Sequence, residues 1–143
     1  MTDRMDGEHM SDEIKAPVVV FPDQDPANTY RVAYDLLARR APSDALARLE
    51  PALESEPDNT GLRTLRAWAL YMRVQLGKAE AELRSLVEED PSDDWARHTL
   101  GRTLERQSRY DEALPHLRLA AAMTGDPEHE TAVLRVERRL MGW

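Results

Sequence analysis

A period of 34 residues runs through most of this chain and constrains its fold more than any other feature. From about residue 26 onward, five columns of residues recur at this spacing. Four columns hold small or apolar side chains, and the fifth holds helix-ending residues: Ala45, Ala79 and Ala113; Leu36, Leu70 and Leu104; Leu49, Leu83 and Leu117; Ala33, Ala67 and Gly101; Pro57, Pro91 and Gly125. Five columns in one phase rarely arise by chance, so we infer an array of repeated units that stack on one another.

Each unit is predicted to form two helices joined by a turn. In the second unit, apolar residues follow helical spacing through both halves: Leu62, Leu65, Ala69 and Leu70, then Leu76, Ala79, Leu83, Leu86 and Val87. Between units, Pro57-Asp58-Asn59 and Pro91-Ser92-Asp93 combine a residue that cannot continue a helix with residues that cap the next one. Aromatic residues make up only 6% of the chain, which also favours helices over strands.

These features resemble the tetratricopeptide repeat (TPR) family, whose unit is a 34-residue helix-turn-helix. The third unit carries the family pattern best, in Ala96, Leu100, Gly101, Leu104, Tyr110, Ala113, Leu117 and Ala120. The resemblance implies an all-α, right-handed superhelix of three repeats, and the Arg-rich composition suggests a small member of bacterial type. The large aromatic residue that the family places fourth in each unit is replaced here by Thr29, Arg63 and Arg97.

This interpretation divides the chain into five parts. An acidic tail spans residues 1–25, the three repeats span 26–59, 60–93 and 94–126, and a capping helix spans 127–143. The capping helix is predicted from Asp126-Pro127, an N-cap followed by a proline at the first helical position, and it brings the total to seven helices.

The tail carries seven acidic and two basic residues, a net charge of −5 out of −8 for the whole chain. Its first 17 residues lack apolar periodicity, so the tail is predicted to be disordered. The short apolar patch Val18–Phe21 interrupts it. This patch either packs back on the repeats or meets another chain, and the sequence leaves both alternatives open.

Catalytic and cofactor motifs are missing from the sequence. It has no cysteine, no glycine-rich phosphate loop and no nucleophile elbow, and its four histidines form no i, i+4 pair. We therefore expect a noncatalytic protein without a cofactor or a metal. The net charge of −8 disfavours nucleic acid as a partner. The acidic start and the absence of a long apolar run predict a cytoplasmic protein that does not contact membranes.

The resemblance implies that the first helix of each unit lines a concave groove that binds ligands. Carried onto this sequence, the groove positions are Tyr30, Tyr34, Leu37, Trp68, Tyr71, Met72, Trp95, His98, Arg102 and Arg106. Five of the eight aromatic residues in the chain fall on this surface, and aromatic and arginine side chains dominate binding hot spots. The alternative is that some rings, Trp68 and Tyr34 first, fill the space between the helices.

Two functions follow from this interpretation. The first is an adaptor that binds a peptide segment of a partner protein in the groove. The second is self-assembly into a homodimeric scaffold, through the groove, the N-terminal tail or both. The sequence does not name the partner, because TPR arrays of one shape serve many processes.

Overall fold

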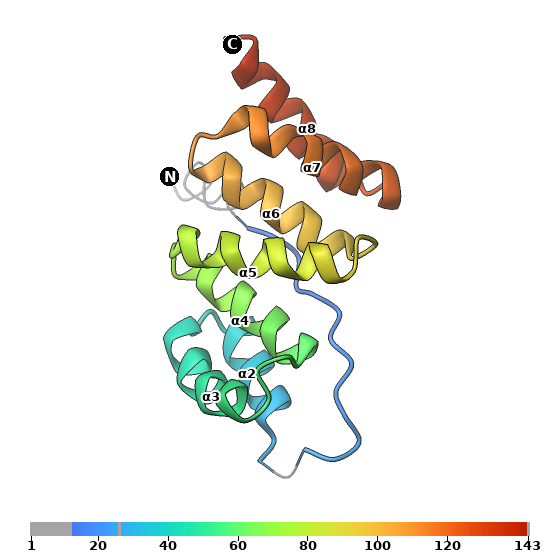
Figure 1. The fold of residues 1–143 in the computed structure, drawn as a ribbon. Helices are drawn as coiled ribbons and strands as arrows, with labels where there is room; N and C mark the ends of the chain where they lie inside the picture. The colour runs from blue at the N-terminus through green and yellow to red at the C-terminus, as the bar shows by residue number, and fades with distance from the viewer. Residues whose placement is uncertain (1–12, 26, 143) are drawn as a thin grey trace.

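The computed structural model describes residues 13–25 and 27–142, and within them it contains seven helices and no strand. The helices follow one another along the chain: α2 (Thr29–Ala38), α3 (Pro42–Ser55), α4 (Thr60–Met72), α5 (Leu76–Glu89), α6 (Asp94–Arg106), α7 (Tyr110–Thr124) and α8 (Pro127–Leu140). Each helix packs against the next, and they stack in chain order (Figure 1). Over these described residues, the predictions of an all-α fold and of seven helices are confirmed. The first 12 residues of the predicted tail lie outside the described residues.

The repeated columns form the core. Ala45, Ala79 and Ala113 are fully buried, and so are the leucines at positions 49, 83 and 117. One apolar cluster joins α2, α3 and α4, and a second extends from α4 to α8. The period therefore marks the positions at which one helix packs on the next, where burial of a leucine stabilises the fold by roughly 2 kcal/mol.

Short polar residues start the helices that begin units two and three. The Asn59 side chain accepts a hydrogen bond from the Leu62 amide at 3.0 Å, and Asp93 does the same for Ala96. Asp126 accepts from the Glu128 amide at 2.9 Å and caps α8. Each cap satisfies one of the amides that a helix start leaves without a partner.

The turns inside the units share a backbone conformation that could not be predicted from their residue types. Arg40, Val74 and Ser108 each have a φ angle near +60°, the left-handed region that usually favours glycine. In each turn, the amide of the following residue donates to the carbonyl of Leu36, Leu70 or Leu104. This pattern is a Schellman motif, so the leucine column marks the helix ends as well as the core.

The arginine at the fourth place of the second unit is buried and forms hydrogen bonds to the neighbouring helix. Arg63 is buried, with 6% of its surface exposed. Its guanidinium donates to Glu82 at 2.8 Å, to Ser85 at 2.7 Å and also to Glu89, all on α5. Arg66 donates to the same Glu82 carboxylate. Ion pairs thus join α4 to α5 where the family would place an aromatic ring.

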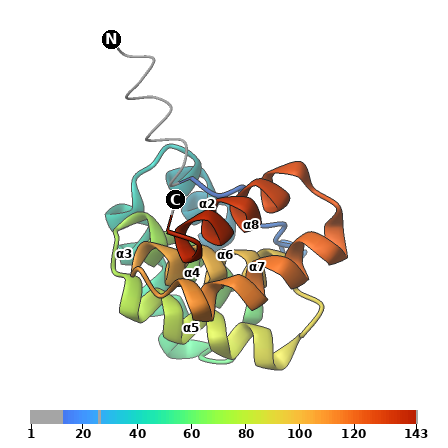
Figure 2. The same ribbon diagram turned by 90° about the horizontal axis from the view of Figure 1, so that it is seen from above.

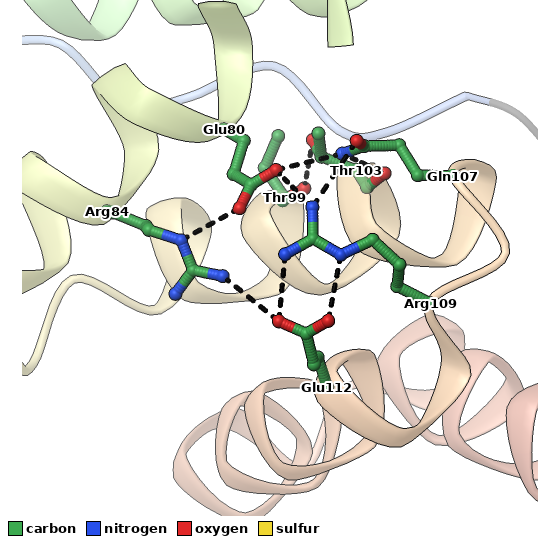
Figure 3. Close-up of polar contacts among 7 residues, drawn as sticks. All are labelled: Glu80, Arg84, Thr99, Thr103, Gln107, Arg109 and Glu112. Atoms are coloured by element: carbon green, nitrogen blue, oxygen red, sulfur yellow. Dashed lines mark hydrogen bonds and ion pairs between the residues drawn. The ribbon is translucent and has the colours of Figure 1, made fainter. Parts of the chain in front are cut away.

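A second polar cluster joins α5 to the start of α7 (Figure 3). Glu80 accepts hydrogen bonds from Arg109 at 2.6 Å, Arg84 at 2.9 Å and Gln107 at 3.1 Å. Arg109 also pairs with Glu112. Burial would raise the pKa of Glu80, but these donors outweigh it and lower the pKa to about 2. The carboxylate therefore stays ionised and holds the two units together.

Candidate functional site

The first helices of the units, α2, α4 and α6, carry all the predicted groove residues. The structure buries Tyr30, Leu37, Trp68, Tyr71, His98 and Arg102 and leaves Tyr34, Met72, Trp95 and Arg106 partly exposed. Leu37 belongs to the core between α2 and α3 and is 1% exposed. The other predicted residues are brought together along one surface, which we call the groove.

Three rings connect α2 to α4 within the groove. The Tyr34 and Trp68 rings meet edge to face with 5.4 Å between their centroids. The Tyr30 hydroxyl reaches across to the Asn59 side chain at 2.8 Å. Further along, the Arg106 guanidinium lies over the Tyr71 ring at 5.1 Å. Part of the predicted aromatic surface thus serves inter-helix packing.

The groove is not empty. Residues 13–21, which we call the strap, run without helical structure from beside α6, down the side of the stack, to the start of α2, as the blue segment of Figure 1 shows. Figure 2, viewed from above, places the same blue segment within the outline of the stack. At the α2 end, the Phe21 ring lies 5.9 Å from both Tyr30 and Tyr34, measured between centroids. The groove of this chain therefore accommodates an extended peptide, its own.

Two groove side chains donate hydrogen bonds to the strap backbone. The Trp95 indole nitrogen donates to the Lys15 carbonyl at 2.7 Å, and Arg102 donates to the Glu13 carbonyl at 3.1 Å. Both donors were among the predicted groove residues. Sequence reasoning missed Arg40 and Asp126, whose side chains pair with Glu13 at 2.9 Å and with Lys15 at 2.5 Å. Both lie outside the first helices, where the family pattern gives no signal.

A pair of stacked histidines joins α6 to α8. The His98 and His129 rings are nearly parallel, with centroids 3.9 Å apart. Burial lowers the pKa of His98 to about 3, and His129, Arg102 and Arg135 add to the effect against an opposing contribution from Asp126. The Nδ1 atom of His98 has no hydrogen-bond partner among the described residues. His98 is therefore neutral at pH 7 and packs as an apolar ring.

This burial predicts acid sensitivity. Below the ordinary histidine pKa of 6.5, the unfolded chain binds a proton at His98 that the folded chain does not bind until about pH 3. The stabilising contribution is therefore full above pH 6.5 and is lost as pH falls, by about 1.4 kcal/mol per pH unit. Urea unfolding between pH 7 and 5 should show this slope in the native chain and a shallower one in His98→Gln. Equal slopes would contradict the buried, neutral histidine.

Within 13–25 and 27–142, no group of three His, Cys, Asp or Glu side chains is placed to hold a metal ion. Over the same ranges, no helix is long and apolar enough to cross a membrane.

Comparison with known proteins agrees with this architecture. Residues 36–97 match the family model described as a tetratricopeptide repeat. Among curated proteins, none is significantly similar in sequence to this chain.

Two solved structures share the fold at low sequence identity. The first TPR domain of the human RPAP3 protein, solved by NMR, superposes with a TM-score of 0.72 at 15% identity, over 81% of this chain and 92% of that domain. The MamA D159K mutant superposes with a TM-score of 0.70 at 21% identity, over 86% of this chain and 73% of that one. The seven helices of this protein are thus packed in sequence as the helix-turn-helix repeats of the tetratricopeptide repeat fold.

Proposed function

We propose that this protein is a noncatalytic adaptor that binds an extended peptide segment of a partner protein in its groove. TPR domains are in general protein-protein interaction modules, which sets the class of function. The observation that carries the proposal for this chain is the strap: the groove holds an extended segment through side-chain donors aimed at its backbone carbonyls. Such contacts bind the backbone of any extended peptide, whatever its sequence. The neighbouring apolar surface then selects among side chains.

Selection of random peptides displayed on phage against the full chain tests this proposal. Selected peptides should lose at least tenfold in affinity when Tyr34 and Trp95 are both changed to Ala, because truncating an interface ring costs about 1 to 2 kcal/mol. Both rings are partly exposed, so the helices should remain folded, and circular dichroism checks this. Leu119→Ala with Leu134→Ala is the matched control, since both leucines are exposed on α7 and α8. Equal losses in the two double variants would contradict a groove site.

Self-assembly is the second candidate function, and the strap is again the observation that favours it. The contacts that hold the strap in its own groove would serve equally in the groove of a second copy, as in a swapped dimer. Light scattering of the full chain distinguishes the two arrangements, since only the swapped one doubles the mass of 16.3 kDa.

A further inference from the structure

The strap has one side that faces the groove and one that faces solvent. Val19 packs against the α2–α4 cluster, whereas Val18 and Val20 are 95% and 86% exposed. Ile14 packs against both core clusters. The alternation over Val18, Val19 and Val20 is what an extended chain produces when it lies on a surface, because successive side chains point to opposite sides.

Val19 meets the groove at a position that has no side chain. Gly61 lies in the first turn of α4, and a Cβ built there would be 3.3 Å from a Val19 methyl carbon and 3.0 Å from the Tyr30 ring. The strap thus packs closely against the surface of α4 at this point. An alanine there would press on both neighbours, and a longer side chain would occupy the space of Val19.

Elsewhere the strap fills the groove incompletely. A cavity of 490 Å³ lies between strap residues 15–20 and a mixed wall that includes Gly61, Trp95 and the carboxylates of Asp93, Asp94 and Asp126. A second cavity, of 200 Å³, lies between Ile14 and the side chains of Trp68, Tyr71 and Met72. A segment that leaves such spaces gives up part of the contact that a closely fitting ligand would make. A peptide with a larger apolar side chain at the place of Ile14 would make contacts with Trp68, Tyr71 and Met72 that the strap does not make.

We propose that the strap is an intramolecular ligand that occupies the groove until a partner's segment displaces it. The partner's segment is extended and presents backbone carbonyls to Trp95 and Arg102. It carries apolar side chains at the places of Ile14, Val19 and Phe21, and the one at the place of Ile14 is larger than isoleucine. The description of the partner rests on the proposed function, whereas occupation of the groove by the strap is testable without any partner.

The tether gives a simple expectation for competition. Because the strap is covalently joined to α2, it meets the groove at an effective concentration of about 1 mM. A strap whose own affinity is about 100 μM would then be docked about 90% of the time, and the affinity of any competitor would fall about tenfold. Release of the strap should therefore raise the affinity of a competitor about tenfold.

The test uses a fluorescent peptide of residues 13–22 and four full-length chains. The native chain and Val18→Asp keep the strap docked and should bind the peptide weakly. Ile14→Asp combined with Val19→Asp empties the groove and should bind it at least tenfold more tightly, because these two side chains face the groove. Adding Trp95→Phe to that double variant removes the donor to the peptide backbone and should weaken binding again. All substitutions except Trp95→Phe lie outside the helices, and circular dichroism confirms the fold of each chain.

Two results would overturn the proposal. One is equal affinity of the native chain and the double variant for the peptide, including absence of binding to both. The other is a native chain that is dimeric by light scattering and becomes monomeric in the double variant, which would move the strap to a second copy. Neither result depends on the random-peptide selection. If the phage selection yields no groove-binding peptide but the strap is shown to dock, the adaptor function is rejected and the proposal that the strap occupies the groove stands.

The Trp95 indole gives a direct readout of docking in the full chain. In ¹⁵N NMR spectra, the indole N–H signal of Trp95, assigned by its loss in Trp95→Phe, should move and exchange faster with water in the double variant. It should stay in place in Val18→Asp. A Trp95 indole signal that is the same in the native chain and in the double variant would show that the donor does not hold the strap.

Discussion

Arg63→Met is expected to lower the free energy of unfolding by about 3 kcal/mol, as measured by urea unfolding at pH 7. The change removes a buried guanidinium that donates to Glu82 and Ser85 and leaves the Glu82 carboxylate, 9% exposed, with one cationic partner fewer. Arg66 still donates to Glu82, which keeps the loss below that of a fully stranded charge. Methionine retains most of the apolar stem, so the loss reports the charge more than the packing.

A double-mutant cycle separates these contributions. Glu82→Gln removes the charge that Arg63→Met would strand, so the double variant should be more stable than the sum of the two single losses predicts. Arg31→Met on the exposed side of α2 is the matched control and should change stability by less than about 0.5 kcal/mol. A buried-arginine variant as stable as this control would mean that the ion pairs between α4 and α5 contribute nothing.

The Arg63 site also shows why the helices could be predicted and this contact could not. The substitution of an expected aromatic by arginine is visible in the sequence, but its partner is not, because Glu82 lies 19 residues away on the next helix. The same spacing recurs in the third unit, where Arg97 lies 3.5 Å from the Nδ1 atom of His116. Once the contact between the two helices of one unit is known, the 34-residue period therefore predicts which residues meet in the next unit.

The strap marks a second limit of sequence reasoning. The Val18–Phe21 patch was recognisable as apolar in a polar tail, yet its place depends on surfaces that exist only after the helices assemble. Donors such as Trp95 and Arg102 were predicted from their positions on the first helices, since the family pattern assigns those faces. Arg40 lies in a turn and Asp126 at a helix cap. The repeat pattern assigns groove positions only on the first helices, so it did not indicate that these two side chains would pair with the strap.

Small residues carry a further part of the pattern, because they set how closely two helices approach. In the column formed by Ala33, Ala67 and Gly101, only the third unit has glycine. A Cβ built on Gly101 would lie 2.6 Å from Leu117 Cδ2 and 3.3 Å from the Leu117 backbone nitrogen. Leu117 is itself fully buried, so it has little room to move away. The helices α6 and α7 therefore pack at a distance that only glycine permits.

Gly101→Ala is accordingly expected to lower the free energy of unfolding by about 2 kcal/mol, although alanine favours a helix by about 1 kcal/mol over glycine. Gly77→Ala is the matched control: Gly77 lies in the first turn of α5, and a Cβ there meets nothing within 4 Å. This control should gain about 0.5 kcal/mol from helix propensity alone. Opposite signs for the two substitutions in urea unfolding would identify contact with Leu117 as the cause. A gain for both would mean that α6 and α7 can separate at little cost, and that the glycine at this place is not required for packing.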